Sequence, residues 1–103
     1  MKIKKVRGSN QKLCKLAFNG DMTIYTAEAI HEQFKTHLEK SSNFDLTLKG
    51  VEEIDSTGLQ LLLAIKRHTE TAGGSLTLTM SSAPVLEILE LFNVSQRFDM
   101  AAV

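Results

Sequence analysis

Two segments in which apolar and polar residues alternate, separated by a leucine-rich segment, constrain the fold most strongly. Phe44, Leu46 and Leu48 alternate with polar residues, and residues 76–80 repeat the pattern. Such alternation is typical of β-strands that bury one face and leave the other in water. The leucine-rich segment 56–69 is long enough to be a helix. A strand, a helix and a second strand in this order predict parallel strands joined by a crossover.

The remaining segments extend this unit. Residues 3–6 and 13–18 flank a turn at 8–11 and predict a hairpin, which Asn19 to Asp21 should end. Thr26 is the expected N-cap of a helix to about residue 40, and Gly50 is expected to break the middle strand. Ser82 should cap a last helix to about residue 93, and Phe98 should hold the tail.

The predicted class is therefore α/β, in the order β-β-α-β-α-β-α. We expect one domain over residues 1–103, built on a mixed sheet of about four to five strands. The partly polar alternation indicates that the helices lie mainly on one face of the sheet.

Composition excludes several classes of function. Twelve basic and twelve acidic residues cancel, so no basic surface for nucleic acid or membrane is expected, whereas weak homodimerisation is plausible. No apolar run reaches the length of a signal peptide or a membrane span, which indicates a cytoplasmic protein without membrane insertion. We interpret the single cysteine, Cys14, as a buried strand residue. His31 and His37 are six residues apart, so we expect no metal site, and no cofactor is expected.

The loop Asp55-Ser56-Thr57-Gly58 is the main candidate for function, because it places two hydroxyl groups where a helix begins. Free backbone N–H groups and the helix dipole favour negative charge at that end, so a phosphate on Thr57 or Ser56 would be tolerated. Gly58 would let a kinase approach closely. An ordinary structural role is the alternative, in which Asp55 or Ser56 is an N-cap and Leu61 belongs to the core.

Helical spacing also predicts a docking surface. Thr57, Leu61, Ala64 and His68 are spaced by four, three and four residues and would share one stripe. An enzyme is not expected, because Ser56 and His68 would stand roughly 18 Å apart along the helix and no phosphate-binding glycine motif is present.

The chain resembles the STAS domains, a family named after sulphate transporters and anti-sigma factor antagonists. Residues 51–63 are similar to the family signature, and 18–22 with 26–28 are similar to its second strand and first helix. Gly73-Gly74 and residues 83–92 also fit, so the similarity covers nearly the whole chain.

The resemblance implies a phosphorylation switch. In stand-alone members of the antagonist type, the dephosphorylated protein binds a kinase-like anti-sigma factor, the kinase phosphorylates the loop hydroxyl, and a phosphatase resets it. Carried over, the acceptor is Thr57, ranked slightly ahead of Ser56, and Asp55 is the family's loop aspartate. The implied partner surface includes Asp21 and Thr23, although antagonists often carry an aspartate where this chain has Thr23.

That departure leaves the partner open. The runs Thr23 to Thr26 and Leu59 to Leu63 look more like stand-alone STAS proteins associated with chemotaxis or two-component signalling. A constitutive accessory subunit of an ABC-type lipid transporter is the alternative that the resemblance also allows.

Overall fold

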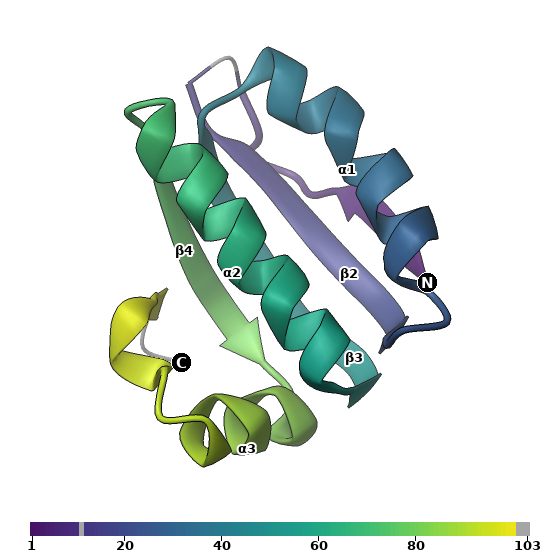
Figure 1. Cartoon of the computed structure of the whole chain (residues 1–103). Coiled ribbons are helices and arrows are strands. Elements are labelled where there is room, and N and C mark those ends of the chain that lie inside the picture. The colour runs from purple at the N-terminus through teal and green to yellow at the C-terminus, as the bar shows by residue number, and fades with distance from the viewer. Residues whose placement is uncertain (11, 101–103) are drawn as a thin grey trace.

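The computed structural model describes residues 1–10 and 12–100 as one mixed five-stranded sheet with three helices (Figure 1). Gln11, in the predicted turn, and residues 101–103 lie outside the described part. The elements are β1 (Lys2–Lys5), β2 (Cys14–Met22), α1 (Ala27–Lys40), β3 (Asn43–Ile54), α2 (Ser56–Thr71), β4 (Ser75–Ser81), α3 (Ala83–Leu91), a 3₁₀ turn η1 (Ser95–Arg97) and β5 (Asp99–Met100).

The strands lie in the order β1-β2-β3-β4-β5, which is also their order along the chain. β1 pairs antiparallel with β2, as the predicted hairpin requires, and every other pair is parallel. The α/β class and the predicted order of the first seven elements are therefore confirmed. The short strand β5 was not predicted, because two residues are too few to show alternation.

One face of the sheet forms the core. The alternate residues that point to this face are buried in each central strand: Leu16 and Phe18 in β2, Phe44, Leu46 and Leu48 in β3, and Leu76 and Leu78 in β4. α1 and α2 lie side by side across it, and α3 follows the end of β4 (Figure 1). The residues between, such as Thr47 and Thr77, stay half-exposed on the other face. The prediction that the helices lie mainly on one face is confirmed.

Two predicted strand ends are wrong. β2 continues through Asn19 to Met22, and β3 continues through Gly50 to Ile54. Gly50 marks a close approach between strands, because a Cβ there would overlap the side chain of Asn19. The register between β2 and β3 shifts nearby, between Ala17 and Asn19, so the strands bulge and continue.

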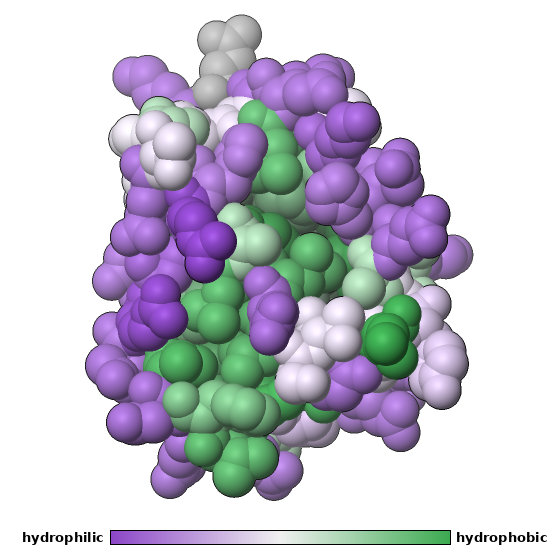
Figure 2. Space-filling model, in the orientation of Figure 1, coloured by the Kyte–Doolittle hydropathy of each residue, from purple (hydrophilic) through white to green (hydrophobic). Residues whose placement is uncertain are grey.

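Two predictions for single residues of the core are confirmed. Cys14 is buried in β2, and Phe98 is buried against the body of the domain. None of the described helices combines the length and the apolar character that crossing a membrane would need. Apolar side chains gather on the surface over α3 and between α3 and α2 (Figure 2), where Leu86, Leu91 and Phe92 are exposed.

Candidate functional site

The candidate site lies where β2, β3 and α2 meet. Met22 and Ile54 are register partners at the ends of the two parallel strands. The backbone N–H of Asp55 donates to the carbonyl oxygen of Met22 at 3.2 Å, and α2 begins at the next residue, Ser56. The predicted loop is therefore attached to β2 before the helix begins.

Asp55 is the N-cap of α2, as one of the two sequence interpretations proposed. Its Oδ1 accepts from the backbone N–H of Gly58 at 3.0 Å. Its Oδ2 accepts from the backbone N–H of Ile24, also at 3.0 Å. These backbone donors, the Ile24 N–H first and the Gly58 N–H second, hold the pKa of the Asp55 carboxyl below its ordinary value. One carboxylate thus ties the start of α2 to the segment after β2.

Gly58 is buried, which corrects the expectation that it offers a partner a close approach. A Cβ at this position would overlap the carbonyl oxygen of Met22 and press on the side chain of Ile54. The missing side chain lets the first turn of α2 pack against the end of β2. The glycine is therefore needed inside the domain rather than at its surface.

The two hydroxyl residues differ in accessibility. Ser56 is exposed, whereas Thr57 is half-buried. Successive helical residues point about 100° apart, so the two side chains leave the helix in different directions. Neither residue is fully buried, and both stand at the helix end whose N–H groups favour an anion.

The predicted partner residues fall into two separate surfaces. Leu61, Ala64 and His68 line a groove of about 200 Å³ between α2 and α1, with Phe34 at its floor and His31 on its other side. Leu61 is half-buried there, and Ala64 and His68 are exposed. Three residues of the predicted stripe thus share one groove beside α1, whereas the fourth, Thr57, is not among the residues that line it.

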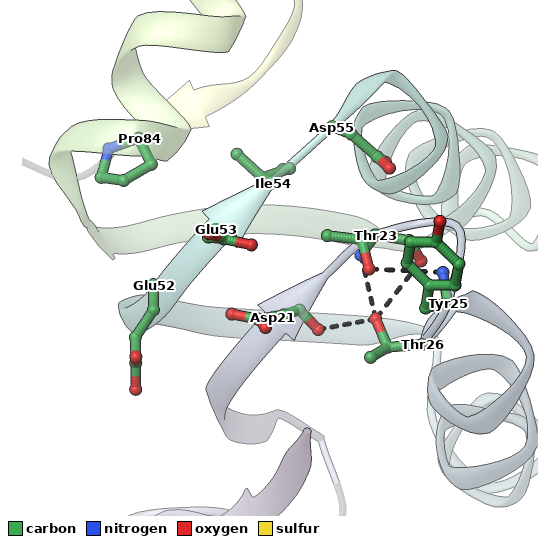
Figure 3. A pocket seen from close by; sticks show the side chains of 9 residues that line it. All are labelled: Asp21, Thr23, Tyr25, Thr26, Glu52, Glu53, Ile54, Asp55 and Pro84. Atoms are coloured by element: carbon green, nitrogen blue, oxygen red, sulfur yellow. Dashed lines mark hydrogen bonds between the residues drawn. The ribbon is translucent and has the colours of Figure 1, made fainter.

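The second surface is an open depression of about 570 Å³ at the ends of β2 and β3 (Figure 3). It brings Asp21, Thr23 and Asp55 together, as the sequence predicted. Its complete lining is Asp21, Thr23, Tyr25, Thr26, Glu52, Glu53, Ile54, Asp55 and Pro84. Among residues 1–10 and 12–100 the one ion pair is Lys66–Glu70, so the carboxylates of this depression form no ion pair with Lys or Arg.

A family comparison decides what kind of domain carries this site. The family model described as "Mlab, STAS domain" matches residues 7–101. The chain belongs to the STAS domain family.

Individual relatives of this STAS chain are anti-sigma factor antagonists. It is 25% identical over 83 residues to the anti-sigma-B factor antagonist of Bacillus subtilis (strain 168), covering 81% of this chain and 76% of the relative. Among solved structures, a protein described as an anti-sigma factor antagonist from Thermotoga maritima matches with a TM-score of 0.82 at 23% identity, covering 99% of this chain and 86% of that one.

A second structural match is the antagonist SpoIIAA, solved in an unphosphorylated form and, from Bacillus, in a phosphorylated form. The TM-scores are 0.76 and 0.72 at 16% and 14% identity, with 98% of this chain covered in both cases and 89% and 92% of the other chain. At these identities the structural matches show the fold, which is that of an anti-sigma factor antagonist.

Sequence reasoning placed Thr23 on the partner surface but did not assign Ile24 and Tyr25 to it. Ile24 and Tyr25 are 64% and 94% exposed, beside the predicted acceptor loop. Thr26 is at the N-cap position of α1 as predicted, but its side chain makes no capping bond to the helix. The available signal was the position of two large apolar residues outside any strand or helix pattern. The acidic residues Glu52 and Glu53 also line the depression.

The described residues contain no cluster of three or more histidine, cysteine or acidic side chains that could hold a metal ion.

Proposed function

We propose that this STAS chain is a regulatory protein-binding module that is switched by phosphorylation at the start of α2. The observation that carries the proposal is the exposed hydroxyl of Ser56 at the first position of a helix whose N-cap is fixed by two hydrogen bonds. The antagonist-like fold and the antagonist relatives support it. The partner in this proposal is a kinase-type anti-sigma factor, and a phosphatase reverses the modification.

Exposure favours Ser56 as the acceptor, which reverses the ranking made from sequence. A kinase must bring the γ-phosphate of ATP in line with the acceptor oxygen, and this needs free space around the hydroxyl. Ser56 is exposed and Thr57 is half-buried. Thr57 remains the second candidate.

The switch would act through charge and solvation. A phosphate adds about 1.5 to 2 negative charges at neutral pH, next in sequence to Asp55, which lines the same depression as Asp21, Glu52 and Glu53, and these carboxylates form no ion pair. Burying such an anion under a docked partner costs several kcal/mol unless new cationic contacts form. Helix α2 itself tolerates the phosphate, because its N-terminal end favours negative charge. The phosphate would therefore weaken docking while the domain stays folded.

The test uses the purified chain, the anti-sigma factor kinase encoded in the same genome, ATP and Mg²⁺. Mass spectrometry should find one phosphate on Ser56, absent from Ser56→Ala and retained by Thr57→Ala. Ser56→Asp should weaken binding of the kinase. Ser75→Asp is the matched control, because Ser75 is exposed at the opposite end of the sheet. Absence of phosphate on both residues, with unchanged binding by Ser56→Asp and Thr57→Glu, would overturn the proposal.

A second candidate is a constitutive accessory subunit of an ABC-type lipid transporter. The match to the Mlab family model favours it. In that role the same surface would dock on the transporter ATPase without a phosphate. Co-purification with such an ATPase, and loss of ATPase activity on deletion of this chain, would select this role over the first.

A further inference from the structure

The segment Thr23 to Thr26, between β2 and α1, displays large apolar side chains on a surface beside the acceptor loop. Tyr25 is 94% exposed and Ile24 is 64% exposed. Neither side chain belongs to the core, and Tyr25 lines the depression together with Asp21 and Glu53 (Figure 3). We call residues 23–26 the apolar tip.

The tip is held in one conformation by its own hydrogen bonds. The Thr26 Oγ1 accepts from the backbone N–H of Thr23 at 2.9 Å and donates to the carbonyl oxygen of Asp21 at 2.7 Å. The backbone N–H of Ala27 donates to the carbonyl oxygen of Thr23 at 2.9 Å. Because the backbone is already ordered, binding of a partner would cost mainly the rotamer freedom of the side chains.

A further bond joins the tip to the acceptor loop. Asp55 uses Oδ2 for the backbone N–H of Ile24 and Oδ1 for the backbone N–H of Gly58, both at 3.0 Å. The first contact spans 31 residues of sequence. The position of the tip relative to Ser56 is therefore set by one side chain.

We propose that Ile24 and Tyr25 are the apolar anchor of the partner interface, and that Asp55 is the positioning residue that holds this anchor beside Ser56. The inference rests on the proposed function, because its partner is the kinase-type anti-sigma factor. The partner should therefore carry an apolar pocket that accepts Tyr25 and Ile24, and Lys or Arg side chains should border this pocket.

The charge around the tip supports this choice of partner. Asp21, Glu52 and Glu53 form no ion pair within the described residues. A protein surface with basic side chains complements them, whereas anionic lipid or nucleic acid would be repelled. Buried tyrosine side chains are also frequent energetic centres of protein interfaces.

The first experiment tests the positioning role without a partner. Asp55→Asn keeps the size of the side chain but has one acceptor oxygen in place of two, so it can satisfy one of the two N–H groups. Amide hydrogen exchange followed by NMR should show that Ile24 or Gly58 exchanges at least about tenfold faster than in the wild type. Glu53→Gln is the control, because the Glu53 side chain makes no hydrogen bond to another described residue, and it should leave both amides unchanged. Unchanged exchange in Asp55→Asn would overturn the positioning role.

The second experiment tests the anchor, with the unphosphorylated chain and the purified anti-sigma factor kinase as the probe. Tyr25→Ala and Ile24→Ser should each raise the Kd at least about tenfold. Leu91→Ser is the matched control, because Leu91 is 78% exposed on α3, and it should change the Kd less than about twofold. The double variant Glu52→Lys/Glu53→Lys should weaken binding and reduce its dependence on salt.

The outcomes separate this inference from the proposed function. Wild-type binding that Tyr25→Ala does not weaken, or that Leu91→Ser weakens equally, would overturn the anchor while the phosphorylation switch stands. Weakening by Tyr25→Ala without any phosphate on Ser56 or Thr57 would support the anchor and overturn the switch. Binding of a transporter ATPase in place of the kinase would overturn the partner assigned to this surface.

Discussion

Replacement of Gly58 by alanine should destabilise the whole domain through one backbone contact. The new Cβ would overlap the carbonyl oxygen of Met22, which belongs to the backbone of β2 and cannot rotate away. α2 also cannot lift freely, because Leu59 and Leu62 of the same turns are buried in the core. Overpacking of this kind costs about 1–3 kcal/mol, and the upper end fits a clash with backbone.

Helix propensity opposes this loss. Alanine is preferred over glycine inside a helix by up to about 1 kcal/mol. The expected net loss for Gly58→Ala is therefore about 2 kcal/mol, which corresponds to a fall in Tm of about 8–16 °C for a domain of this size. Urea unfolding followed by circular dichroism measures the free energy, and a thermal scan measures the Tm.

Gly73→Ala separates this steric effect from backbone strain. Gly73 has a φ of +76° and nothing within 4 Å of a Cβ, so alanine there should cost roughly 1–2 kcal/mol through conformation alone. That variant should leave the amide exchange of Ile24 unchanged, whereas Gly58→Ala should accelerate it by shifting the start of α2. A Gly58→Ala protein as stable as the wild type would refute the close packing of α2 on Met22.

Three further predictions follow from single residues. The pKa of Asp55 is lowered in the folded state, so its contribution to stability should be present above about pH 4 and lost as the pH falls further. Urea titrations from pH 7 to pH 2.5 should show that the free energy of unfolding falls less with acid in Asp55→Asn than in wild type. Burial raises the pKa of the Cys14 thiol, so labelling by a thiol reagent in the native state should be slow and should accelerate in urea; rapid native labelling would contradict it. Phe98→Ala should remove about 3 kcal/mol of unfolding free energy and release β5, which exchange at the Met100 amide would report.

The central fold is readable from sequence because its signals are local. Alternation in 44–48 and 76–80 and the leucine-rich helix between them are each visible in one segment. The continuation of β3 through Gly50 is not visible, because it depends on how closely Asn19 of the neighbouring strand approaches. β5 is equally hidden, since its two residues form a strand only by pairing with Thr77 and Leu78.

The candidate site shows the same division. The loop from Asp55 to Gly58 is recognisable because a short motif precedes a strongly patterned helix. The second bond of Asp55, to Ile24, joins positions 31 residues apart and has no sequence signal. Helical spacing grouped Thr57 with Leu61, Ala64 and His68, but only the last three line the groove beside α1, and the spacing could not tell which neighbouring helix they face.

The separation between buried strand faces and the exposed residues at their ends has an evolutionary consequence. Ile24, Tyr25, Glu52 and Glu53 stand outside the buried core, so substitutions there should cost little folding free energy. Binding specificity can therefore change through a few substitutions at these exposed positions. Selection for a stable fold acts on a different set of positions, the buried ones. Duplicated copies of such a gene could diverge into insulated signalling routes without passing through unstable intermediates.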